Sequence, residues 1–181
     1  MQDKRPSFQP LALGLTIAAA LLRLVPHPYN FTPVGGIALF GGARLKGWQA
    51  YVIPLLAMLI TDPILSSMAG YPMYSPATLI IYFSFLIYVV LGRFLIGNST
   101  NPLRIGAVAL AGSVQFFLIT NLFVWMGDKT YPHTLAGLAS CYVAALPFFS
   151  RTLVGDLFYA GVLFTAYALA ERKLEPAEKR S

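Results

Sequence analysis

Charged side chains are scarce in this sequence of 181 residues: they account for 11% of it, whereas 57% of it is hydrophobic. A soluble domain usually carries about 25% charged residues, so the composition argues against a fold that is surrounded by water. The length suits one compact unit rather than two domains. We therefore expect residues 1–181 to form a single transmembrane domain, in which residues 171–181 are a charged cytoplasmic tail.

Cysteine and histidine are almost absent, and their scarcity limits the disulfides and metal sites that the chain can form. The single cysteine, Cys141, excludes an intramolecular disulfide and a cysteine-based zinc cluster. The spacing of Cys141, His27 and His133 matches no metal-binding motif; Cys141 is the one candidate metal ligand, and we expect no cofactor. The signatures of P-loop, dinucleotide-binding, serine-hydrolase and zinc-peptidase proteins are absent as well.

Long apolar runs fill most of the sequence, and a run of about 20 such residues is what a membrane-crossing helix requires. Proline and glycine divide these runs into six helices, and Pro147 separates the last of them from a further short helix at the outer membrane face. The fold class that we predict is an all-α integral membrane protein, a six-helix transmembrane bundle. The predicted ranges are 10–25, 33–43, 48–69, 75–96, 105–127 and 148–170, with the short helix at 134–146.

Lys and Arg together number 13 against seven acidic residues, which in a soluble protein would suggest a nucleic-acid partner. Here ten of the thirteen fall on one side of the predicted bundle. Because cytoplasmic loops are the ones enriched in Lys and Arg, we predict a multi-pass inner-membrane protein with both termini in the cytoplasm and no nucleic-acid partner. The ten are Lys4, Arg5, Arg44, Lys46, Arg93, Arg104, Arg172, Lys173, Lys179 and Arg180.

Three linkers on the opposite side share proline, glycine and aromatic residues: "VPHPYNFTPVGG" (25–36), "GYPMYSP" (70–76) and "GDKTYPHTLAG" (127–137). Aromatic rings stack on flat ligands, and proline holds a loop in place at low entropic cost. An aromatic belt at the membrane interface is the alternative explanation. We predict that these loops form the mouth of an outward-facing pocket, with His27, Tyr29, Asn30, Phe31, Tyr71, Tyr74 and His133 as ligand-binding residues.

Four ionisable residues lie inside the predicted helices, where a charge at the helix centre costs roughly 2.5–3.5 kcal/mol. Arg23, Asp62, Arg151 and Asp156 all fall in the outer half of the bundle. Two are positive and two are negative, so we expect ion pairs between helices. Asp62, Arg151 and Asp156 are also expected to line the pocket.

The predicted fifth helix carries Asn121, Trp125 and Asp128 near its outer end. Offsets of four and three residues place side chains on one face of a helix. We therefore expect these three residues to complete the pocket, whereas Tyr88, in the middle of the fourth helix, should lie outside it.

Two stretches, "PHPYNFTPVGGIALFGGA" (26–43) and "LPFFSRTLVGDLFYAGVLF" (146–164), are similar to an uncharacterised bacterial family of membrane transport proteins. Together with the six-helix layout, they resemble the substrate-binding S-components of energy-coupling-factor vitamin transporters. The resemblance implies a vitamin-like or heterocyclic ligand that binds from the outer side. It also implies a transmembrane coupling subunit with two ATPases, which docks on small residues of the first helix.

Ala12, Thr16 and Ala20 match that docking pattern, with threonine where the family has alanine. Small residues at this spacing allow helices to approach closely, and packing inside the bundle explains them equally well. Two other functions stay open: a membrane-embedded enzyme that acts on a lipid or isoprenoid, with Asp62, Asp156 and a histidine as acid–base groups, and a structural subunit of a membrane complex.

Overall fold

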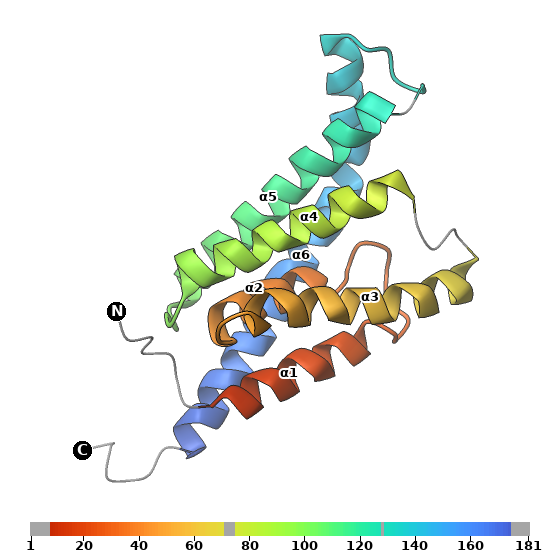
Figure 1. Cartoon of the computed structure of the whole chain (residues 1–181). Helices are drawn as coiled ribbons and strands as arrows, with labels where there is room; N and C mark the ends of the chain where they lie inside the picture. The colour runs from red at the N-terminus through yellow and green to blue at the C-terminus, as the bar shows by residue number, and fades with distance from the viewer. Residues whose placement is uncertain (1–7, 71–74, 128, 175–181) are drawn as a thin grey trace.

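The computed structural model describes residues 8–70, 75–127 and 129–174, and that part of the chain is built of helices without strands (Figure 1). It confirms the predicted all-α fold with six α-helices, and a short π-helical segment, η1, follows the fourth. The elements are α1 (Gln9–Leu22), α2 (Val34–Arg44), α3 (Gln49–Ala69), α4 (Pro76–Leu91), η1 (Gly92–Ile96), α5 (Pro102–Gly127) and α6 (Leu135–Leu174).

Four helices (α3, α4 with η1, α5 and α6) are long and apolar enough to cross a membrane. Their outward side chains are large and apolar; Leu79 is 77% exposed and Leu103 is 82% exposed. Lipid is the solvent that such a surface requires. The chain is therefore a membrane protein, in which α1, with 14 residues, is shorter than a full crossing.

The glycine-rich helix α2 forms the centre of the bundle, and every one of its residues is buried. It lies among α1, α3, α4 and α6 (Figure 1). Two glycines make the approach between α2 and the fourth helix close: a Cβ on Gly42 would overlap the carbonyl of Val89, and a Cβ on Gly92 would overlap the carbonyl of Leu39. The glycines thus replace side-chain packing with contact between backbones.

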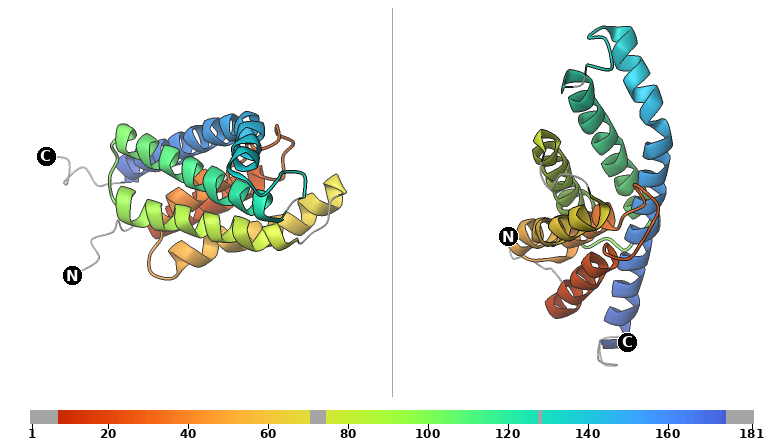
Figure 2. Two further views of the ribbon diagram at one scale, coloured as in Figure 1. Left: turned by 90° about the horizontal axis from the view of Figure 1, so that it is seen from above. Right: turned by 90° about the vertical axis from the view of Figure 1, so that its right-hand side faces the viewer.

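The two ends of the bundle differ. The N-terminus of α1, the C-terminus of α6 and the links α2–α3 and η1–α5 gather at one end, which we call the terminal end (Figures 1 and 2). Arg44 ties this end together: its guanidinium donates hydrogen bonds to the carbonyls of Gly97 and Ser99 and stacks on Phe164, 4.9 Å from the ring centroid. The loop at 23–33 and the outer tip of the α5–α6 hairpin lie at the other end, the distal end.

The structure corrects the prediction that Pro147 separates two helices, because α6 is one continuous helix from Leu135 to Leu174. Proline is tolerated inside membrane helices that pack against neighbouring helices, and α5 packs here on both sides of Pro147: the ring of Phe117 contacts Tyr142 before the proline and Phe149 after it. At 1.5 Å per residue, the 40 residues of α6 extend roughly 60 Å. The α5–α6 hairpin therefore projects beyond the other helices (Figures 1 and 2).

Candidate functional site

An ion pair joins the end of α1 to α3. Arg23 Nη2 lies 2.5 Å from Asp62 Oδ1, and both side chains are less than one-fifth exposed. Arg23 Nη1 donates to the Thr61 hydroxyl, and the Tyr82 hydroxyl of α4 donates to Asp62 Oδ2 over 2.5 Å. This confirms the predicted pairing between charged residues of different helices. Charge and hydrogen bonding together offset the cost of holding these groups away from water.

Asp156 of α6 is buried, with 3% of its surface exposed. Its Oδ2 accepts hydrogen bonds from the Tyr88 hydroxyl of α4 (2.5 Å) and from Ser113 Oγ of α5 (2.7 Å). Gly35 of α2 makes room for the carboxyl group, because a Cβ there would overlap Asp156 Oδ1. Four helices therefore meet at this carboxyl group, and hydroxyl groups take the place of the arginine that the sequence suggested.

The two acidic groups line one hollow at the distal end, which we call the polar chamber. Its volume is about 360 Å³. Arg23 and Asp62 form one wall, Asp156 and Thr152 of α6 form another, and Asn30 lies on the loop between α1 and α2. Much of the remaining lining comes from α4, its N-cap and α5, and it combines aromatic rings with hydroxyl groups: Ser75, Thr78, Tyr82, Phe85 and Phe116.

A second hollow, the aromatic chamber, of about 290 Å³, lies between α5 and the N-terminal half of α6. It shares Asn30, Ile81, Phe116 and Thr152 with the polar chamber, so the two are adjoining compartments. Rings dominate its lining, with Phe117 of α5 and Phe148 and Phe149 of α6 added to the shared Phe116. Ser113, Thr120 and Asn121 add polar groups to the shared Asn30 and Thr152.

The loop at 25–33 is fixed against α6 rather than left free above the chambers. Phe31 packs on Phe158 and Tyr159, with ring centroids 5.7 and 5.5 Å apart. A Cβ on Gly155 would come within 3.2 Å of the Phe31 Cα, so glycine permits this approach. Asn30 adopts a left-handed conformation (φ 64°), which asparagine tolerates better than most residues, and this turn places Asn30 at the junction of the two chambers.

The structure thus brings four of the predicted site residues to the chambers: Asn30, Asp62, Asn121 and Asp156. Three others, Tyr29, Phe31 and Arg151, meet at a separate, shallow depression on the outside of the loop. Arg151 is exposed there, and no ion pair is seen for it among the described residues.

The structure places the remaining described candidates away from both chambers. Trp125 Nε1 donates to the Pro132 carbonyl over 3.0 Å, and its ring lies against His133, so both residues brace the tip of the α5–α6 hairpin. His27 Nδ1 lies 2.9 Å from the Val25 carbonyl of its own loop. Tyr71, Tyr74 and Asp128 lie outside the described residues.

Cys141 is buried in the α5–α6 hairpin, where its Sγ lies 3.6 Å from the Asn121 carbonyl. Within the described ranges, no three His, Cys, Asp or Glu side chains are grouped so as to hold a metal ion. The small residues of α1 also face inward: Ala12 and Thr16 are fully buried, and Ala20 is 9% exposed. These side chains therefore pack within the bundle, the alternative given for them above, and the docking of a coupling subunit on α1 stays a prediction.

Several residues of the chambers escape detection from sequence. Tyr88 lines neither chamber, in keeping with the expectation, but its hydroxyl contacts Asp156, which lines one. Tyr82, Ser113 and the phenylalanines are ordinary members of apolar runs. A hydroxyl group inside a membrane helix indicates a hydrogen bond to a neighbouring helix. The sequence does not indicate which helix supplies the partner.

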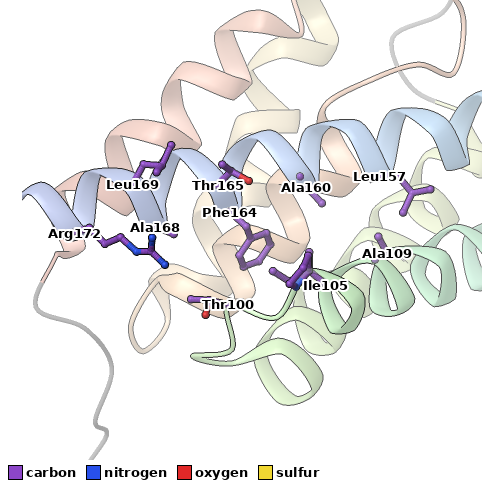
Figure 3. Close-up of a pocket in the computed structure, with 13 residues that line it drawn as sticks. Thr100, Ile105, Ala109, Leu157, Ala160, Phe164, Thr165, Ala168, Leu169 and Arg172 are labelled. Atoms are coloured by element: carbon purple, nitrogen blue, oxygen red, sulfur yellow. The ribbon is translucent and has the colours of Figure 1, made fainter.

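A larger groove of about 470 Å³ lies between α5 and α6 toward the terminal end (Figure 3). Its lining is mostly small and apolar, with Ala109, Ala160 and Phe164 on its floor and Arg172 at its end. It contains no group of polar side chains like that of the polar chamber. The chambers at the distal end are therefore the better candidate site.

Comparison with known proteins supports no assignment from relatives, because no curated protein and no solved structure matches the chain. One family model does match, and it covers residues 4–178, which is nearly the whole sequence. The chain with these two distal chambers therefore belongs to a family of unknown function, DUF6580.

Proposed function

We propose that this protein binds a small molecule in the two chambers and serves in its transport across the membrane, either alone or as the substrate-binding component of a larger transporter. The observation that carries the proposal is the composition of the joined hollow. Charged, hydroxyl and amide groups from α1, α3, α4 and α6 converge on a lining that is otherwise apolar. Ligand sites have this balance: mostly apolar walls with a few placed polar groups.

The location of the chambers supports a transporter that takes its ligand from outside. Their linings include Asn30, on the loop at 23–33, which lies at the distal end, opposite both termini (Figure 1). The excess of Lys and Arg at the terminal end favours a cytoplasmic position for that end. We therefore place the chambers on the outer side of a bacterial inner membrane, and a vitamin-like or heterocyclic ligand fits the resemblance to S-components.

The competing function is a membrane-embedded enzyme, and the arrangement of the polar groups speaks against it. Both Asp62 oxygens are taken up by Arg23 and Tyr82, and Asp156 is held by two hydroxyl groups. Neither His27 nor His133 lines a chamber. A general base needs to lie within hydrogen-bond reach of the proton that it removes, and no such histidine–carboxylate pair is assembled here.

The test is mass spectrometry of small molecules that co-purify with the protein. Thr152 borders both chambers, so Thr152→Trp should fill them, and the co-purifying molecule should be lost. Thr165→Trp is the matched control, since Thr165 lies on the same helix but lines only the groove at the terminal end. A molecule that is retained by Thr152→Trp, or is lost equally from both variants, would contradict binding in the chambers.

A further inference from the structure

The charges that face the polar chamber do not balance. Arg23 and Asp62 neutralise each other across 2.5 Å. Asp156 is then the remaining acidic group of the lining, and within the described part of the chain it has hydroxyl partners but no cation. A carboxylate buried away from water without a counter-charge is costly. Either a proton on the carboxyl group or a cation in the chamber would remove this cost, and the excess of acidic over basic groups in the lining favours a ligand that brings the cation.

The hydrogen bonds to Asp156 occupy only one of its two oxygens. Tyr88 and Ser113 both donate to Oδ2. Oδ1 lies against Gly35, on the side where a Cβ would overlap it, and no donor contacts it among the described residues. Asp156 lines the polar chamber, and its carboxyl group retains hydrogen-bond acceptor capacity that Tyr88 and Ser113 do not use.

The aromatic chamber indicates the chemical character of the other half of the ligand. Phe116, Phe117 and Phe149 surround a hollow of about 290 Å³ that adjoins the polar chamber at Asn30 and Thr152. Phenylalanine rings favour apolar or aromatic groups as neighbours. A molecule that occupies both compartments is polar at one end and apolar at the other.

From these observations we infer that the ligand is an amphipathic organic cation, whose protonated nitrogen lies at Asp156 and whose ring or chain lies among the phenylalanines. This inference rests on the proposed binding function and names the chemical class of its ligand. An anionic ligand is disfavoured, because it would compete with Asp62 for Arg23 and would face the Asp156 carboxylate.

The test compares three probes that share one ring and differ only in the head group: tryptamine, tryptophol and indole-3-propionate. At neutral pH these are a cation, a neutral alcohol and an anion. Binding to the purified protein is measured by titration calorimetry in detergent, with protein-free micelles as the blank. We expect tryptamine to bind at least about tenfold more tightly than either of the other two.

Two variants locate the effect. Asp156→Asn should remove the preference for tryptamine over tryptophol, whereas Phe149→Ala should weaken all three probes by a similar factor. The ranking of the probes on the wild-type protein stands even if Asp156→Asn fails to fold. If tryptophol or indole-3-propionate binds as tightly as tryptamine, the chambers bind small molecules but the cationic class is wrong; if none binds at millimolar concentration, the proposed site fails with it.

Discussion

Arg23 and Asp62 form an ion pair across α1 and α3, with 2.5 Å between Nη2 and Oδ1, and this pair forms a wall of the polar chamber. Each residue has a further hydrogen bond, to Thr61 and from Tyr82. The same contact therefore holds the short first helix to the bundle and shapes the candidate site. We therefore expect removal of this ion pair to lower the stability of the protein more than it weakens ligand binding.

We predict that Arg23→Met and Asp62→Leu will each destabilise the protein by roughly 3–5 kcal/mol, because each leaves one buried charge without its partner. The double variant should recover most of that loss, since it leaves neither charge behind. Unfolding in detergent, followed by circular dichroism, measures all three variants. Single-variant losses that simply add in the double variant would show that the pair is not coupled.

The close approach of α2 to the fourth helix gives a second prediction. Gly42→Ala should destabilise the protein by about 1–3 kcal/mol, the usual cost of overpacking, because its Cβ would overlap the Val89 carbonyl. Gly161→Ala is the matched control: nothing lies within 4 Å of its Cβ position, so the gain in helix propensity of about 1 kcal/mol should prevail. Thermal unfolding of the two variants should therefore shift in opposite directions.

Tyr88 provides a test of the Asp156 cluster. Tyr88→Phe keeps the ring and removes only the hydroxyl that donates to Asp156. Hydrogen bonds to charged groups contribute about 1.5–3 kcal/mol, so we expect a loss of that size in the free energy of unfolding. Tyr29→Phe, at a residue that is 81% exposed, should change nothing; equal melting of the wild type and Tyr88→Phe would contradict the role given to this hydroxyl.

Arg44 is buried at the terminal end, and lysine should not replace it. A guanidinium donates to two carbonyls and stacks on a ring at once, whereas an ammonium group cannot reproduce that geometry. We expect Arg44→Lys to cost about 1.5–3 kcal/mol through the lost charged hydrogen bonds to Gly97 and Ser99. Lys173→Arg, the control at an exposed position, should melt with the wild type in the same denaturation series.

The orientation in the membrane is tested by cysteine labelling in a Cys141→Ser background. Pro28→Cys and Lys129→Cys lie at the distal end, and Asn98→Cys and Lys173→Cys lie at the terminal end. An impermeant maleimide applied to intact cells, with the outer membrane made permeable, should label the first two and not the others. Labelling of Pro28→Cys and Asn98→Cys from the same side would overturn the proposed topology.

Much of the fold was predictable because lipid imposes simple requirements on sequence. Apolar runs and their breakers indicated all six helices, including the short α2 between Pro33 and Leu45. Pro147 misled the prediction because a proline inside a helix is tolerated where a neighbouring helix supports both sides of it, as Phe117 does here. That support depends on tertiary contact, which the local sequence does not reveal.

The candidate site was predictable in part for a similar reason. The cost of a charge in lipid identified Asp62 and Asp156 as residues that need partners, and Arg23 supplied one. The partners of Asp156 were missed, because Tyr88 and Ser113 look like ordinary residues of apolar helices. Trp125 was wrongly expected in the pocket, because it lies at the tip of the α5–α6 hairpin. Helical periodicity predicts which residues share a face of α5, but not how far the hairpin extends beyond the bundle.

The complete burial of α2 has a consequence for how the protein enters the membrane. With 11 residues and a buried arginine at its end, α2 is too short to be recognised as a spanning segment by the insertion machinery. It is also surrounded by protein on all sides in the folded bundle. The native packing of α2 against α3, α4 and α6 is therefore completed only after these helices, which follow it in the chain, have been synthesised.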